Sequence, residues 1–112
     1  MVFTHTMTVE AHLQQQVKGQ VLTPDHPDYD RIRQGWNLST IHYPALILVA
    51  YDAQDIIAGV RFASASGLGV AVQSTGHGIQ QPADGALLIV TTKMNSVQVD
   101  AEAQTAIVEA GA

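Results

Sequence analysis

The chain has 112 residues, of which 46% are hydrophobic, and carries 5 Lys and Arg against 10 Asp and Glu, a formal net charge of −5. This length predicts one domain, and so few basic residues argue against a nucleic-acid partner, which requires clustered Lys and Arg. With no cysteine, the chain lacks disulfides and thiolate sites. The sequence shows no secretory signal, and its longest apolar run covers only residues 44–50, so we expect a cytoplasmic protein without a membrane partner.

Two short helices are predicted in the amino-terminal part of the chain. Val9, Leu13 and Val17 recur every four residues, which is typical of an amphipathic helix, and Gly19 is the expected stop. Residues 28–33 indicate a second helix that follows turn-forming residues and ends before a glycine.

From residue 44 onward the pattern favours strands around one longer helix. The continuous apolar run over residues 45–50 predicts a buried strand, and shorter runs over residues 70–72 and 86–90 predict two more. Asp52 is a candidate N-cap for a helix that continues to Gly67. Strand, helix and strand in this order predict a βαβ unit with parallel strands.

The last part of the chain alternates between apolar and polar residues. Val97 and Val99, then Thr105 and Ile107, predict two short antiparallel strands joined by a turn over residues 100–104, with one face in solvent. The predicted fold class is therefore α+β: a βαβ unit with a small parallel sheet, followed by a short antiparallel hairpin and preceded by two short amino-terminal helices.

The loop over residues 73–85, QSTGHGIQQPADG, is the strongest candidate for a binding site. Gly76 and Gly78 allow a close approach to the main chain, and Ser74 and Thr75 add hydroxyl donors. Open α/β sheets bind ligands at loops of this kind, which leave the carboxyl end of a parallel strand. No lysine follows the glycines as in a phosphate-binding Walker loop. Composition and spacing leave two alternatives open, an ordinary turn and an anion or nucleotide cradle.

Several segments in order carry a more specific signal: ALILVAYDAQDIIAGVRFASASGLGVAVQSTGHG, then DGALLIVTTKMNSVQVD, then TAIVEAGA. Their succession resembles the first half of the FAD-binding domain of the FAD-linked oxidases related to vanillyl-alcohol oxidase and p-cresol methylhydroxylase. Within them it is most similar to the branch of berberine bridge enzyme and 6-hydroxy-D-nicotine oxidase. The resemblance implies a leading helical segment over residues 1–43. Residues 44–112 are then the first subdomain of an incomplete p-cresol methylhydroxylase-type FAD-binding domain.

The resemblance also assigns the cofactor-binding residues. In the family the diphosphate loop usually reads Arg-Ser-Gly-Gly-His-Ser, and its places are here taken by Gln73, Ser74, Thr75, Gly76, His77 and Gly78. His77 takes the place of the histidine that this branch bonds to the 8α-methyl group of the flavin, and a neutral imidazole nitrogen is a competent nucleophile. Gln73 in place of arginine removes a positive charge. Thr75 in place of glycine would be strained if its position required a positive φ.

The implied function is that of a flavin-dependent oxidoreductase, which oxidises a small alcohol, amine or sugar by hydride transfer to FAD. We expect the chain to be an amino-terminal fragment whose carboxyl-terminal part is a missing partner. Such a fragment should bind FAD weakly or not at all and should not turn over substrate. The alternative is a non-catalytic α+β module without cofactor, which covers exposed apolar surface and strand edges by forming a homo-oligomer.

The remaining histidines and the tryptophan are expected to have structural roles. His5, His12, His26 and His42 lack the spacing of metal ligands and are expected at the surface. Trp36 is expected to be a packing anchor rather than a cofactor contact.

Two tyrosines and three aspartates are also expected to have structural roles. Tyr43 and Tyr51 are expected to pack in the core or at a strand edge. Asp52 and Asp55 are expected to cap a helix and stabilise its dipole, and Asp84 to close the loop before the last parallel strand.

Overall fold

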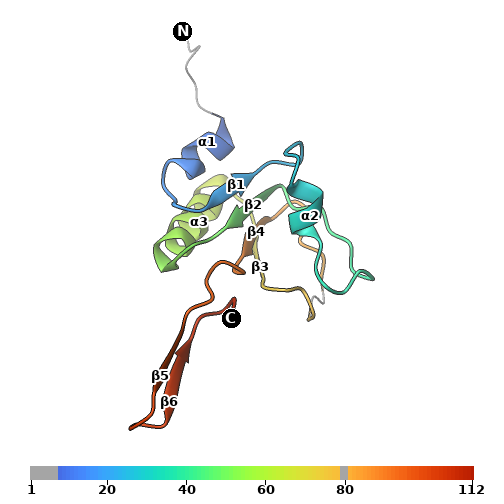
Figure 1. Ribbon diagram of the computed structural model, residues 1–112. Coiled ribbons are helices and arrows are strands. Elements are labelled where there is room, and N and C mark those ends of the chain that lie inside the picture. The colour runs from blue at the N-terminus through green and yellow to red at the C-terminus, as the bar shows by residue number, and fades with distance from the viewer. Residues whose placement is uncertain (1–7, 79–80) are drawn as a thin grey trace.

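In the computed structural model, which describes residues 8–78 and 81–112, a four-stranded sheet carries helices on both faces, and a separate hairpin projects from it (Figure 1). The elements in chain order are α1 (Val9–Gln14), β1 (Gln20–Leu22), α2 (Tyr29–Arg33), β2 (Leu46–Val49), α3 (Ala53–Ser66), β3 (Val70–Gln73), β4 (Leu87–Val90), β5 (Val97–Asp100) and β6 (Thr105–Val108). The predicted α+β class is confirmed. None of the helices described here is long and apolar enough to cross a membrane.

The larger sheet has the strand order β1-β2-β4-β3. β2 and β3 each pair with β4 in parallel, whereas β1 pairs with β2 antiparallel. The predicted βαβ unit is thus present as β2-α3-β3, with β4 inserted between its two strands. The three parallel strands consequently end at one edge of the sheet, which is where ligands bind in sheets of this kind.

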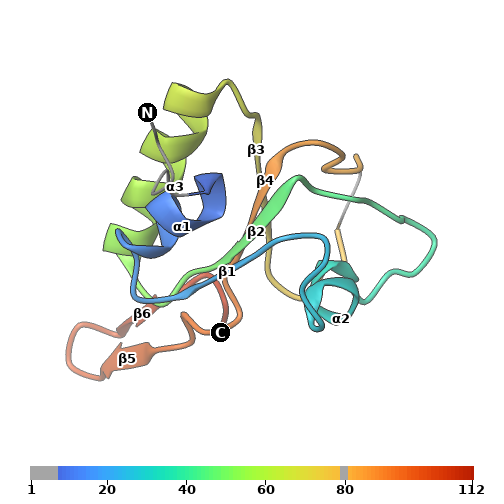
Figure 2. The same cartoon turned by 90° about the horizontal axis from the view of Figure 1, so that it is seen from above.

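Both faces of the two central strands, β2 and β4, are buried. Leu48 and Ile89 pack with α1 and α3 on one face, while Ile47 and Leu88 pack with α2 on the other (Figure 2). This two-sided burial accounts for the unbroken apolar runs of β2 and β4, because a strand covered on both faces has no polar alternation.

The long helix α3 begins and ends as predicted. The carboxylate of Asp52 accepts a hydrogen bond from the main-chain N–H of Asp55 at 3.0 Å, and this bond, with Lys18 nearby, lowers the pKa of Asp52. Gly67 ends the helix in the left-handed conformation, with φ 71°. Within the helix, a Cβ atom at Gly59 would lie 2.7 Å from the side chain of Leu48, so this glycine lets α3 approach the sheet.

The first helix is shorter than predicted, and strand β1 was not expected. α1 ends at Gln14 instead of continuing to Gly19. The Gln14 side chain donates to the carbonyl of Gly19 at 2.8 Å and accepts from the N–H of Val21 at 2.9 Å, so it holds the start of β1. Gly19 itself lies against β2, where a Cβ atom would be 1.9 Å from the carbonyl oxygen of Val49.

The predicted antiparallel hairpin is confirmed, but the prediction that one of its faces is buried is not. β5 and β6 pair from Val97 with Val108 to Asp100 with Thr105, and all eight strand residues are exposed. The expectation of a single solvent face is therefore wrong for this chain, because nothing in its described part covers the other face.

Candidate functional site

The segment that follows α2 holds the amino-terminal end of the loop between β3 and β4. The main-chain N–H of Trp36 donates to the carbonyl of Thr75 at 2.6 Å. Gly76 has φ 82°, and a Cβ atom there would lie 2.3 Å from the Cα of Gly35, so both its conformation and this contact require glycine. Thr75 does not have a positive φ, since Gln104 is the only described non-glycine residue that does. The strain considered for Thr75 is therefore absent.

The other end of the loop is fastened by the residues that lead into β2. The N–H of Ala83 donates to Nδ1 of His42 at 3.1 Å, and the carboxylate of Asp84 accepts from the N–H of Tyr43 at 2.7 Å. Residues 34–45 and the loop are thus held together at two places, although some 40 positions separate them in the sequence.

One face of the His77 ring stacks against Trp36. Their ring centroids are 4.4 Å apart and the ring planes are inclined by 13°, a stacked arrangement. The hydroxyl of Thr75 lies 2.7 Å from Nδ1 of His77 and fixes the ring from its edge. Trp36 is 70% exposed, so it is not the packing anchor that its size suggested. Its main chain is tied to the loop, and the indole therefore remains at the surface beside His77.

The loop presents main-chain donors that the protein does not use. Within the described part of the chain, the N–H groups of Ser74, Thr75, Gly76 and His77 donate to no acceptor. Consecutive amides around a left-handed glycine are donors of the kind that bind phosphate oxygens. Gly78 follows these four residues, and a Cβ atom there would meet nothing within 4 Å.

Gln73 is the last residue of β3 and is buried, with 5% of its surface exposed. Its Nε2 lies 3.5 Å from the carbonyl of Gln34, whereas its Oε1 has no hydrogen-bond partner among the described residues. An unpaired buried oxygen costs free energy unless a ligand or water donates to it. Gln73 therefore suits a ligand with hydroxyl or N–H donors.

A hollow of about 470 Å³ lies between these residues, at the carboxyl edge of the parallel strands. Gln73, Ser74, Thr75 and His77 line one side of it. Contributions from elsewhere in the sequence include Gln34, Gly35 and Trp36 after α2, and Val90 and Thr92 at the end of β4. Gly76 and Gly78 line a smaller hollow of about 310 Å³ on the loop itself. The predicted site residues are thus gathered around two adjoining hollows. The residues after α2 and at the end of β4, Trp36 among them, were not predicted to line this site.

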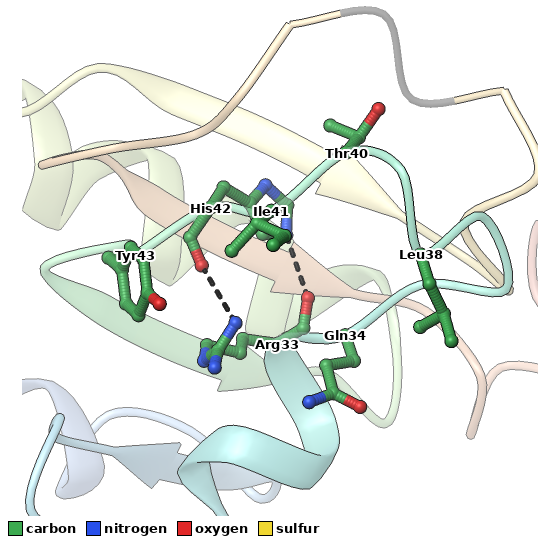
Figure 3. A pocket seen from close by; sticks show the side chains of 7 residues that line it. All are labelled: Arg33, Gln34, Leu38, Thr40, Ile41, His42 and Tyr43. Atoms are coloured by element: carbon green, nitrogen blue, oxygen red, sulfur yellow. Dashed lines mark hydrogen bonds between the residues drawn. The ribbon is translucent and has the colours of Figure 1, made fainter.

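A separate hollow of about 250 Å³ lies beside the segment after α2 (Figure 3). His42 is buried there, contrary to its predicted surface position. Its Nε2 lies 2.7 Å from the carbonyl oxygen of Arg33, and its Nδ1 accepts from Ala83, so both ring nitrogens are engaged. The Arg33 guanidinium pairs with Asp30 at 2.8 Å and lies 4.4 Å from the ring centre of Tyr43. The imidazole of His42 and the guanidinium of Arg33 are thus engaged within the protein, which indicates a structural role for these two side chains.

The other residues considered from the sequence fall outside these hollows or at their margins. Tyr51, just after β2, is 50% exposed, and His12 is exposed on α1. His26 accepts a hydrogen bond from the N–H of Asp28 at 3.0 Å. His5 lies outside the described residues.

Unused amides and a hollow at the carboxyl edge of parallel strands are typical of a domain that binds a phosphate-bearing cofactor. The sequence matches the family described as FAD binding domain over residues 44–112, more than half of the chain. The chain belongs to this family of FAD-binding domains. The donors and the unpaired oxygen of Gln73 fit such a cofactor.

Individual relatives agree with this assignment. (R)-6-hydroxynicotine oxidase of Paenarthrobacter nicotinovorans is 31% identical over 97 residues, which cover 85% of this chain and 21% of the relative. An FAD-linked oxidoreductase of Dictyostelium discoideum is 28% identical over 96 residues, which cover 85% of this chain and 21% of its own length. The chain thus spans about a fifth of the length of the curated relatives it matches.

Solved structures show the same relationship. The crystal structure of 6-hydroxy-D-nicotine oxidase from Arthrobacter nicotinovorans superimposes with a TM-score of 0.78 at 30% identity, over 85% of this chain and 21% of that one. A berberine bridge enzyme-like protein of Physcomitrella patens shares the fold, with a TM-score of 0.82 at 21% identity, over 94% of this chain and 23% of its own. The resemblance noted in the sequence is confirmed.

Proposed function

We propose that the loop over residues 73–78 and Trp36 hold FAD in the hollow at the carboxyl edge of the sheet. The observation that carries this proposal is the group of four unused N–H donors beside the stacked pair of Trp36 and His77. The amides and the hydroxyl of Ser74 bind the diphosphate. Trp36 and His77 lie where an aromatic ring system can pack against them.

We further propose that His77 carries a covalent bond to the flavin. Its ring is held by the Thr75 hydroxyl and by Trp36, so little side-chain freedom remains to be lost when it reacts. In this link a ring nitrogen of His77 would replace one hydrogen of the flavin 8α-methyl group, with the ring proton and the methyl proton both released to solvent. FAD, when bound, would supply the acceptor for the two electrons, and dioxygen would reoxidise it.

The activity of the whole protein is proposed to be oxidation of a small alcohol, amine or sugar. FAD, when bound, supplies the hydride acceptor for such a reaction. The residues of this chain bind the cofactor, orient it and link it. One relative is an oxidase of (R)-6-hydroxynicotine, and its similarity to this chain supports this class of reaction.

Ligand titration of the 112-residue chain tests the binding proposal. Trp36 is the only tryptophan, so its indole N–H gives one reporter signal in a nitrogen-15 NMR spectrum. We expect FAD and ADP to shift the amide signals of residues 74–77, and FAD to shift the Trp36 indole more than ADP does. Binding is expected to be weak. FAD that left all these signals unmoved at millimolar concentration would contradict the proposal.

The covalent link has its own test. The chain is incubated with FAD and dioxygen, precipitated with acid and examined for flavin mass and fluorescence. Flavin is expected on the unmodified chain and not on His77→Ala. The matched control is His12→Ala, because His12 is exposed on α1, away from the loop. Equal labelling of all three chains would rule out His77 as the attachment residue.

The hairpin supports a second candidate, self-association of the chain. Directly opposed residues of an antiparallel pair share a face, so Val97, Val99, Ala106 and Val108 form one apolar face. Val99 is 73% exposed and Val108 58%. We propose that a second copy covers this face in solution. Light scattering should then give a dimer that Val99→Thr weakens, whereas a monomer at millimolar concentration would dismiss the idea.

A further inference from the structure

The hollow beside the loop continues along the edge of the sheet. A neighbouring hollow of about 350 Å³ shares four of its lining residues: Arg31, Ile32, Val90 and Thr92. It extends past the ends of β2 and β4 to Gln20, Tyr51 and Lys93. We call the two together the edge trough. It runs over the carboxyl ends of all three parallel strands, from the loop at β3 to the end of β2.

The charge of the edge trough is opposite to that of the chain. The chain carries 10 acidic and 5 basic residues, yet no described acidic residue lines the trough, whereas Arg31 and Lys93 both do. A chain with net charge −5 therefore offers a positive surface at this edge, which favours an anionic ligand.

The two cations differ in how far they are already neutralised. Arg31 lies 3.4 Å from the carboxylate of Asp28, and both side chains are largely exposed, so this pair is weak. Lys93 has no carboxylate partner among the described residues. By contrast, Lys18 pairs with Asp52 and Arg33 with Asp30, both outside the trough. Lys93 is the least compensated cation of the edge trough.

Gln73 is an independent sign of a ligand in the trough. Its side chain is more than nine-tenths buried, lines the trough and leaves Oε1 without a partner. It also occupies the position where the sequence of the family usually has arginine, so the loop itself lacks a positive charge.

We propose that Arg31 and Lys93 supply the positive charge that holds the diphosphate of FAD, in place of the missing loop arginine. A hydroxyl of the same ligand donates to Oε1 of Gln73. This inference rests on the proposed function, since it concerns the same cofactor, but it assigns binding to two residues outside the loop.

The test measures affinities of the 112-residue chain by NMR titration at low salt. The ligands are FAD, ADP, inorganic pyrophosphate and riboflavin, of which only riboflavin lacks phosphate. Lys93→Gln and Arg31→Gln should each weaken FAD, ADP and pyrophosphate about fivefold, the effect of one unit charge at about 4 Å in water. Riboflavin should be unaffected. The control is Arg61→Gln, because Arg61 is exposed on α3 and does not line the trough. Added salt should reduce the difference between the unmodified chain and Lys93→Gln.

The outcomes separate this inference from the proposed function. FAD binding that is equally tight in the unmodified chain and both variants overturns the inference and leaves the proposed function intact. Binding of ADP and pyrophosphate that depends on Lys93, without binding of FAD, supports the diphosphate site and overturns the flavin function. Binding of none of the phosphate ligands overturns both.

Discussion

The indole of Trp36 lies flat on the imidazole of His77, with ring centroids 4.4 Å apart. These rings come from segments on either side of β2 and α3, and the hydrogen bond from the N–H of Trp36 to the carbonyl of Thr75 brings them together. His77, the proposed attachment residue for the flavin, is therefore positioned by a residue far from its own loop.

Removing the indole should free the His77 ring while costing little stability. Trp36 is 70% exposed, so Trp36→Leu should lower the free energy of unfolding by about 1 kcal/mol, the contribution typical of an aromatic stack. The His77 ring protons should move downfield in the proton NMR spectrum, because the indole ring current no longer shields them. Trp36→Phe should retain part of the shielding. Unchanged His77 signals in Trp36→Leu would show that the two rings do not stack in solution.

Gly76 should be intolerant of any side chain. Gly76→Ala adds a Cβ atom 2.3 Å from the Cα of Gly35 and places alanine at φ 82°, so we expect a loss of at least about 2 kcal/mol in urea unfolding. Gly78→Ala is the matched control in the same loop, because nothing lies within 4 Å of its added Cβ. The contact between residues 35 and 76 would be disproved if the two variants unfolded alike.

Asp55 should be one of the most important side chains for stability. It is 1% exposed, and its carboxylate accepts from the main-chain N–H groups of Lys18, Gly19 and Tyr51 at 2.8 to 2.9 Å. Asp55→Ala leaves these donors without their acceptor, so a loss of about 3 kcal/mol or more is expected. Asp55→Asn, which retains one oxygen, should lose less. Thermal unfolding of the two variants measures both losses, and equal melting temperatures for Asp55→Ala and the unmodified chain would contradict this role.

Stability should fall at alkaline pH through Tyr29. Burial raises the pKa of the Tyr29 phenol above its ordinary value of 10.0, aided by Asp30 and Asp84 and opposed by Arg33. Its hydroxyl donates to the carbonyl of Pro44 at 2.6 Å, which only the neutral phenol can do. Because the folded-state pKa is the higher one, the stabilisation is complete below pH 10.0 and is lost as pH rises through the folded-state value.

Tyr29→Phe separates this effect from other alkaline titrations. The variant should be less stable at pH 7 by about 1 kcal/mol, since it lacks the hydrogen bond. Its urea midpoint should then decline less above pH 10.0 than that of the unmodified chain. Parallel declines of the two midpoints would exclude Tyr29 as the cause.

Periodicity predicted the elements that carry strong local signals. The apolar runs of β2 and β4 are bounded by turn residues, and Asp52 and Gly67 mark both ends of α3. β1 has only three residues, too few for a periodic pattern, and its place depends on pairing with β2. The insertion of β4 between β2 and β3 is likewise a tertiary choice that no local pattern reveals.

The candidate site was predicted only in part, because local patterns identify its loop but not the residues that the tertiary structure brings beside it. The composition of residues 73–78 and the resemblance to the family identified the loop. Trp36 was missed because a large apolar side chain is usually buried, whereas here the main chain fixes the indole at the surface. Arg31 and Lys93 line the edge trough only because the strand order brings the end of β4 next to α2 and the loop.

Hydrogen exchange with and without FAD tests the central claim most directly, because it reports every main-chain amide of the chain at once. With saturating FAD, we expect slower exchange of the amides of residues 74–77 and 35–37, and no change at β5 and β6. Protection confined to the hollow lined by Leu38, Ile41 and Tyr43, or no protection in the loop, would contradict the proposal that residues 73–78 hold the cofactor.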